Sequence, residues 1–251
     1  MPTAKGIKLK TIQPPAELGS FVESFWMIVN PTDRDQRIVI LPDGRFDIIY
    51  SRTEETNLTT TLKGIDTEPK QTSLLARSTF FAVSFKLLAI EYLLPQEVYS
   101  IVDKGVDLPA NFWDITAEDL SDFEQFTAKI SAKLLTLVKP DIDSRKQELF
   151  ELIYASRGTL SVKELSERVF WSSRQINRYF NQTIGISLKA YCSIFRFKSS
   201  LHHLKKGRLF PELNFTDQNH FIKEVKKMSG VTPKQLSRNE DGRFILLSAL
   251  P

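Results

Sequence analysis

Residues 161–180 read SVKELSERVFWSSRQINRYF, and this stretch predicts two short helices joined by a tight turn. Ser161 with Glu164, and Ser172 with Gln175, have the spacing of a capping box. In that motif the serine hydroxyl accepts from the backbone N–H three residues on, and the Glu or Gln side chain reaches back to the cap. The pattern therefore predicts a helix-turn-helix at about 161–183.

The outer side of the second of these helices carries side chains suited to reading DNA. Its apolar residues are expected to face inward, which leaves Ser173, Arg174, Asn177 and Arg178 outside. In a helix-turn-helix, the N-terminal half of the second helix enters the major groove. There an arginine can bind O6 and N7 of guanine, and an asparagine N6 and N7 of adenine. We therefore predict these four side chains as DNA-binding residues.

A long helix and a second candidate reading helix are expected downstream. Ser187 can cap a helix over 188–206, which at 1.5 Å per residue is about 27 Å long. Thr216 can then cap a helix over 217–228. The outer face of that helix would carry Gln218, Asn219 and Lys223. Two reading helices so spaced would lie about 34 Å apart, one turn of B-DNA, so one chain could read two successive major grooves.

Net charge divides the chain near Pro140. Residues 1–140 hold 15 Lys+Arg and 19 Asp+Glu, net −4, while residues 141–251 hold 19 and 11, net +8, and together they give the overall +4. Such asymmetry between halves indicates that one half meets a polyanion while the other has a different role. A solvated basic surface is the alternative explanation of the charge alone.

The first half has the sequence pattern of a small β domain. Short apolar or alternating runs lie between clusters of Pro, Gly, Asn and Asp. The stretch RIVILPDGRFDIIYS (37–51) predicts a β-hairpin whose turn is Pro-Asp-Gly (42–44). A small β-sandwich or barrel is expected. Its further strands are predicted at 21–29, 58–64 and 80–85.

Helices are expected on either side of Pro140. A short piece is predicted at 89–94, an amphipathic helix at 117–138, and a further helix at 145–155. We place the domain boundary at Pro140, between a regulatory, sensor or dimerisation domain (1–140) and a helical domain (141–251). The expected fold class is α+β. The helical domain is expected to hold two helix-turn-helix units, at about 161–183 and 208–230, joined by the helix at 188–206.

The residue types argue against an enzyme. There is no histidine before His202, so the first half has no imidazole for acid–base catalysis or metal binding. Asp43, Asp47 and Asp66 are interpreted as turn and surface carboxylates. We expect no catalytic residue, no bound metal and no cofactor.

Aromatic residues of the first half are candidates for a ligand pocket, although such residues also form the core of a small β domain. The candidates are Trp26, Phe46, Phe80 and Phe85. The single cysteine, Cys192, excludes an internal disulfide and fits a reducing compartment. The start MPTAKGIKLK has no signal-peptide apolar run, and no window approaches the roughly 18 apolar residues that span a bilayer. We expect a cytoplasmic protein.

Three segments, LSVKELSERVFWSSRQINRYFNQTIGISLKAY (160–191), FRFKSSLHHLKKG (195–207) and NFTDQNHFIKEVKKMSGVTPKQL (214–236), together resemble the DNA-binding domain of the AraC/XylS family of bacterial transcription regulators. The D-Q-x-H-F-I-x-E-x-K-K-x-x-G-x-T-P run is a hallmark of that family. The resemblance implies base or phosphate contacts from Arg174, Asn177 and Arg178 in the first unit, and from Gln218, Asn219 and Lys223 in the second. His220 and Phe221 would pack the helix.

The first half is similar, more weakly, to the β-rich domain that precedes this DNA-binding domain in some family members. The similarity lies in the W-x(n)-LPDG-x-x-D-I-I-Y pattern and a late V-S-F strand. It implies a sensor or dimerisation module.

The sequence departs from the family pattern in two places. Phe170 and Trp171 stand in the first turn, where the family has a small or flexible residue, and we expect them to pack into the core. The segment 208–215, which should form the first helix of the second unit, is several residues short and contains Pro211, which cannot lie in a helix interior. An irregular loop is therefore expected to support the second reading helix.

Two functions of different classes remain open. The first is a sequence-specific double-stranded DNA-binding transcription regulator, modulated by a ligand or by dimerisation through its first half. Its partners would be DNA, a small-molecule effector and RNA polymerase, with no membrane, and it would act as a monomer or homodimer. The second is a small-molecule-binding β-domain protein whose helical half serves dimerisation or nonspecific DNA binding.

Overall fold

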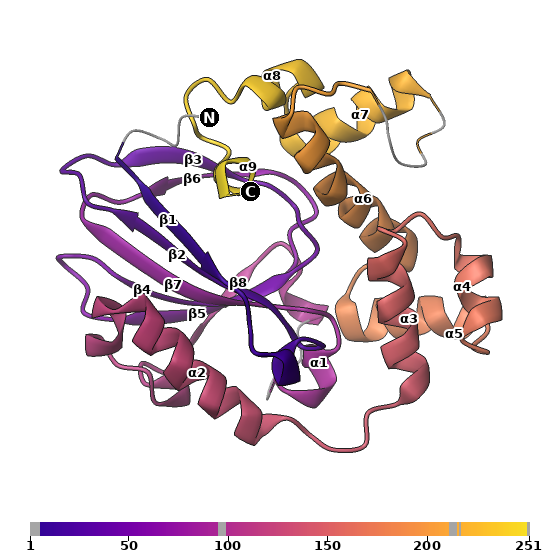
Figure 1. The fold of residues 1–251 in the computed structure, drawn as a ribbon, viewed down its shortest axis with the longest axis horizontal. Coiled ribbons are helices and arrows are strands. Elements are labelled where there is room, and N and C mark those ends of the chain that lie inside the picture. The colour runs from indigo at the N-terminus through magenta and orange to yellow at the C-terminus, as the bar shows by residue number, and fades with distance from the viewer. Residues whose placement is uncertain (1–5, 95–98, 211–214, 216, 250–251) are drawn as a thin grey trace.

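The computed structural model describes residues 6–94, 99–210, 215 and 217–249 (Figure 1). The chain is an α+β protein, with an N-terminal β-rich region followed by a helical region, as the sequence predicts. Its strands are β1 (Lys8–Ile12), β2 (Val22–Asn30), β3 (Gln36–Ile40), β4 (Phe46–Arg52), β5 (Thr59–Lys63), β6 (Lys70–Leu74), β7 (Ser78–Phe85) and β8 (Gly105–Leu108). Its helices include α1 (Ala89–Tyr92), α2 (Phe123–Leu137), α3 (Ser144–Ala155), α4 (Val162–Arg168), α5 (Ser173–Tyr179), α6 (Leu188–Lys205), α7 (Gln218–Ser229), α8 (Pro233–Arg238) and α9 (Ile245–Ala249).

The strands form two antiparallel sheets. The larger has the order β1-β2-β7-β4-β5-β8, and the smaller consists of β3 and β6. Apolar side chains of both sheets meet in one cluster, in which Ile38 and Leu74 of the small sheet pack near Leu9, Ile28 and Phe80 of the large one. Since alternate strand residues face inward, this contact defines a sandwich.

The hairpin expected around Pro-Asp-Gly (42–44) is wrong, because β3 pairs with β6 and β4 pairs with β5 and β7. The turn instead carries the chain from the small sheet to the large one. Gly44 has φ +73°, and a Cβ there would lie 3.1 Å from the ring of Tyr191 in α6. Leu41 and Phe46, on either side of the turn, are both buried. The turn residues therefore set a corner of the sandwich.

The strands at 21–29, 58–64 and 80–85 are confirmed within two residues, while β1, β6 and β8 were not expected. These three are sheet-edge strands or belong to the two-stranded sheet, and their sequences, KLKTI, KQTSL and GVDL, expose many polar side chains. Such strands lack the apolar run that marks a half-buried strand in sequence.

The helix expected at 117–138 begins later, at Phe123. Asp122 is extended (φ −136°, ψ 113°), and its carboxylate accepts from the backbone N–H of Gln125, which makes it the N-cap of α2. A separate 3-10 turn, Glu118–Ser121, precedes it. The apolar spacing runs through both pieces, so periodicity alone does not reveal the cap between them.

One buried cluster runs without a break from the sandwich into the helices. It includes Phe46 and Phe85 on the face of the large sheet that points away from the small sheet, Phe126 of α2, and Phe150 and Tyr191 of the helical region. Within the helical region, Gly158, which follows α3, lies close against α6. A Cβ on Gly158 would lie 2.6 Å from the carbonyl oxygen of Cys192. The helical region is therefore docked on the sandwich through shared core.

We predict that Gly158→Ala destabilises the protein more than Gly207→Ala. Both glycines have left-handed φ, +71° and +75°, where alanine costs about 1–2 kcal/mol. Only at Gly158 would the new methyl meet backbone, because nothing lies within 4 Å of a Cβ at Gly207. Urea denaturation followed by circular dichroism measures both free energies of unfolding. Equal losses would show that the approach of α3 to α6 is not a tight constraint.

Candidate functional site

The first helix pair, α4 and α5, forms as the sequence predicts, with both capping boxes present. The backbone N–H of Glu164 donates to Ser161 Oγ at 3.2 Å, and that of Gln175 donates to Ser172 Oγ at 3.3 Å. Ile176 on α5 is fully buried. The caps and this apolar anchor fix which face of α5 is left outside.

That outer face carries the four side chains singled out from the sequence. Arg174 and Arg178 are exposed, whereas Ser173 and Asn177 are half-buried. Within the described part of the chain, neither arginine has a hydrogen-bond or ion-pair partner. The Asn177 amide donates to the backbone oxygen of Ser173 at 2.9 Å. The two arginines are therefore the most accessible of the four side chains.

The second candidate helix, α7, is capped by Asp217 rather than by Thr216, because the Asp217 carboxylate accepts from the N–H of His220 at 2.8 Å. Thr216 lies outside the described residues, as do residues 211–214 of the segment 208–215, including Pro211. Gln218, Asn219 and Lys223 are all exposed on α7.

The inner side of α7 and its C-terminal end are fixed by packing and by a second cap. Phe221 is buried, and the half-buried ring of His220 lies 5.7 Å from that of Phe215, as expected of packing residues. The helix ends at Gly230 in the left-handed conformation, and Thr232 then caps α8 with a further capping box. Burial of Phe221 and the caps at the two ends of the helix therefore determine which face of α7 is exposed.

The long helix α6 connects the two pairs. Figure 1 shows α4 and α5 near one end of α6, and α7 and α8 near the other. The helix spans Leu188–Lys205 and begins at the Ser187 cap, as expected. The exposed residues of α5 and α7 are thus held apart by a rigid element.

The turn between α4 and α5 differs from the expectation that Phe170 and Trp171 both pack inward. Phe170 has φ +51° and is 91% exposed. Trp171 is half-buried, and its ring lies 5.2 Å from that of Tyr179. The left-handed backbone at Phe170 directs consecutive side chains differently, so only one of them reaches the core.

Polar contacts tie the first helix pair to the sandwich region. The Tyr179 hydroxyl at the end of α5 donates to Glu91 of α1 at 2.5 Å, and Lys146 of α3 pairs with the same carboxylate at 2.7 Å. The Leu87 N–H donates to the Tyr154 hydroxyl at 3.0 Å. These contacts restrict the orientation of α5 relative to the β strands.

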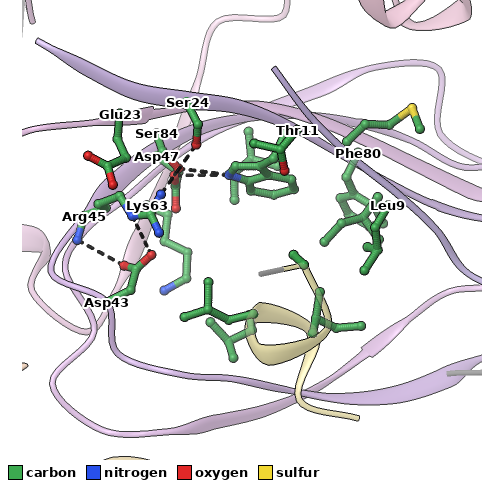
Figure 2. Close-up of a pocket in the computed structure, with 18 of the residues that line it drawn as sticks. Leu9, Thr11, Glu23, Ser24, Asp43, Arg45, Asp47, Lys63, Phe80 and Ser84 are labelled. Atoms are coloured by element: carbon green, nitrogen blue, oxygen red, sulfur yellow. Dashed lines mark hydrogen bonds and ion pairs between the residues drawn. The ribbon is translucent and has the colours of Figure 1, made fainter. Parts of the chain in front are cut away.

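A cavity of about 860 Å³ lies between the two sheets. Cross-strand pairs give its large-sheet wall a gradient of polarity. One row consists of Ser24, Ser84, Asp47 and Lys63 on neighbouring strands, and another, two rows along, contains Leu9, Ile28 and Phe80. Figure 2 shows the charged side chains gathered on one side and Leu9 and Phe80 on the other.

The polar end of the cavity is a set of paired charges. Arg45 binds Asp43 at 2.7 Å, and Lys198, which comes from α6, binds Glu23 of β2 at 2.9 Å. Although burial opposes it, the Lys198 ammonium lowers the pKa of Glu23. Lys198 of α6 therefore extends into the β sandwich.

Asp47 lies beside this set, and no cation among the described residues forms an ion pair with it. Its carboxylate accepts from Ser84 and, at 3.4 Å, from the indole N–H of Trp26. Burial, with the nearby Asp43 charge, raises the pKa of Asp47 to about 6. Asp66 is buried as well and pairs with Lys63 and Lys70. The interpretation of Asp47 and Asp66 as surface carboxylates is therefore wrong: strand alternation turns Asp47 toward the sandwich interior, and Asp66 is buried in the segment after β5 beside its two lysine partners.

The four aromatic residues proposed for a pocket fall into two groups. Trp26 and Phe80 line the cavity. Phe46 and Phe85 stack on one another, with ring centroids 5.4 Å apart, and are fully buried in the core. Alternation again explains the division, because Trp26 and Phe80 lie in the cavity-facing rows of the large sheet.

Two further properties concern the described residues only. They contain no cluster of three or more His, Cys, Asp or Glu side chains arranged to hold a metal ion. Among them, no helix combines the length and the apolar character needed to cross a membrane.

Residues 10–107 match a family model described as a domain of unknown function (DUF6597), which covers less than half of the chain. No curated protein matches the sequence. Among solved structures, ToxT from Vibrio cholerae O395 is similar at a TM-score of 0.44 and 11% identity, over 98% of this chain and 100% of that one. A second ToxT structure gives 0.44 and 12%, over 92% and 97%. ToxT with an unsaturated fatty acid bound gives 0.38 and 12%, over 91% and 93%.

Replacing Asp47 with Asn should change how stability depends on pH. The folded-state pKa is about 6 and the ordinary value is 3.8, so between these pH values the folded protein holds the proton more tightly than the unfolded chain. The native protein therefore loses stability as pH rises through this window, and Asp47→Asn does not incur that loss. Between pH 4 and pH 7 the free energy of unfolding should fall more in the wild-type protein than in the variant. Asp107→Asn, at an exposed position on β8, is the control, and an identical trend in both variants would contradict the prediction.

Proposed function

We propose that this protein is a sequence-specific double-stranded DNA-binding transcription regulator of the AraC/XylS type. One observation carries the proposal: α5 and α7, each capped and anchored by buried apolar residues, present exposed polar side chains near the two ends of one helix. The charge of +8 over residues 141–251 favours a polyanionic partner. In this proposal residues 141–251 bind DNA and residues 1–140 regulate that binding.

The reading residues differ in how ready they are for contact. On α5, Arg174 and Arg178 project freely and suit guanine edges or phosphates, while Ser173 and Asn177 sit closer to the helix surface. On α7, Lys223 suits a phosphate, and the amides of Gln218 and Asn219 suit adenine edges. The first unit thus supplies the stronger cation contacts, and the second supplies more amides.

The cavity supports an effector site in the regulatory half. Its volume of about 860 Å³ lies in the range of small-molecule sites, roughly 300–1,000 Å³. Trp26 and Phe80 provide aromatic wall, and Lys198 links the cavity directly to α6. A bound effector would therefore touch the helix that spaces the two reading helices.

Arg174→Ala and Arg178→Ala should each weaken binding to a selected duplex by about 1–3 kcal/mol if the arginine reads a base, where 1.4 kcal/mol is tenfold in affinity. The duplex is obtained by selecting bound sequences from a random library with the full-length protein. Arg37→Ala, an exposed arginine on β3, is the matched control and should leave affinity unchanged. Unchanged binding by both α5 variants, with the fold intact, would refute the assignment of α5 as a reading helix.

Lys223→Ala tests the second unit separately. If Lys223 neutralises one phosphate, its loss should reduce the slope of log affinity against log salt by about 0.9. The selected sequences should contain two half-sites about one helical turn apart. A single half-site with an unchanged slope would restrict DNA reading to α5. Equal binding of selected and random duplexes would instead favour the alternative of a ligand-binding β domain with nonspecific DNA affinity.

A further inference from the structure

The C-terminal segment returns from the second helix pair to the sandwich. After α8, Asn239 adopts the left-handed conformation (φ +40°) and is buried, and its side-chain oxygen accepts from the N–H of Phe244 at 3.1 Å. Phe244 then pairs in parallel with Val39 of β3, whose N–H donates to the Arg243 oxygen at 2.8 Å. This short connection leads directly into α9.

Helix α9 forms part of the cavity wall. Ile245, Leu246 and Ala249 line the cavity, and Ile245 is only 7% exposed, in a cluster with Ile38 and Leu74 of the small sheet. Figure 1 shows α9 beside β3 and β6, and Figure 2 shows its ribbon bordering the cavity. The apolar cluster between the sheets is therefore completed by a segment from the far end of the chain.

The position of α9 corresponds to the apolar side of the cavity. Leu9, Ile28 and Phe80 of the large sheet pack against the same cluster that contains Ile245. The opposite side holds the hydrogen-bonding row around Asp47 and the pair of Lys198 with Glu23. A molecule that satisfied both sides would need an apolar body and a polar head.

We propose that α9 is a displaceable wall of this cavity, and that an amphipathic small molecule displaces it by contacting the same apolar side chains. Exposing Ile245 and Leu247 to water is unfavourable, so α9 leaves only when the ligand buries a comparable apolar surface. The polar row then orients the head of the ligand. The ligand and α9 thus compete for the apolar side chains between the two sheets.

Displacement of α9 reaches the second helix pair through α8. Residues 239–244 join the two helices directly, and α8 is otherwise held by the buried Leu236 and by Ser237, whose hydroxyl donates to the Leu204 oxygen of α6 at 2.6 Å. Releasing α9 removes one of the anchors of α8, which in turn packs against α7. This coupling is a property of the fold; only its effect on DNA rests on the proposed function.

The test compares the full-length chain with a chain that ends at Phe244 and so keeps the bridge to β3. The probe is N-phenyl-1-naphthylamine, a small apolar amine whose fluorescence rises on leaving water. We expect the shortened chain to bind it at least tenfold more tightly. A peptide of residues 243–251 (RFILLSALP) added in trans should compete with the probe, whereas a scrambled peptide should not. Equal affinity of the two chains for the probe would overturn the proposal.

A full-length variant provides a second test that does not depend on correct folding of the shortened chain. Leu246→Ala removes apolar contact from the half-buried, cavity-lining face of α9 and should also tighten probe binding. Leu135→Ala, at an exposed position of α2, is the control and should not.

Hydrogen exchange measures the coupling without DNA. The amides of α8 should exchange faster in the shortened chain and in the probe-saturated full-length chain than in the free full-length chain. Unchanged exchange in both would overturn the coupling to α8. Since neither measurement uses DNA, failure here and failure of the α5 variants to lose DNA binding are separate outcomes.

Discussion

Burial of one face of α6 is the constraint on which the other parts of the molecule depend. Tyr191, Leu201 and Leu204 are almost completely buried on this helix, and its Cys192 carbonyl leaves no room for a side chain at Gly158. Close-packed contacts of this kind hold elements in one relative position. The two helix pairs are therefore positioned by their attachment to α6, and α6 is positioned by the sandwich.

The Lys198–Glu23 pair extends that constraint into the cavity. Burial and the neighbouring Arg45 lower the pKa of Lys198, so its charge relies on Glu23 and Asp43. Removing one partner of such a pair leaves an uncompensated charge, which is far more costly than the pair itself. A ligand group that bound beside Glu23 would consequently act on α6 directly.

The two sheets of the sandwich are joined by side chains and by the chain end rather than by strand pairing. Among the described residues, neither β3 nor β6 pairs with a strand of the large sheet. Val39 of β3 instead forms an isolated parallel bridge with Phe244. An interface of that kind can open without breaking a strand ladder. The cavity, the small sheet and the C-terminal segment are thus in contact with one another, and the C-terminal segment continues directly from α8.

The sequence by itself determined the local features: the capping boxes at Ser161 and Ser172, the extent of α6, and the outward face of α5, because these depend on residues a few positions apart. Only the tertiary structure decided which strands pair. Pro-Asp-Gly (42–44) allows a hairpin as readily as a corner, and long-range packing selected the corner. The cavity brings together Asp47, Lys198 and Ile245, which are widely separated in sequence. No local sequence pattern predicts that these residues lie close together, because their proximity arises from strand register and from the docking of α6 and α9 on the sandwich.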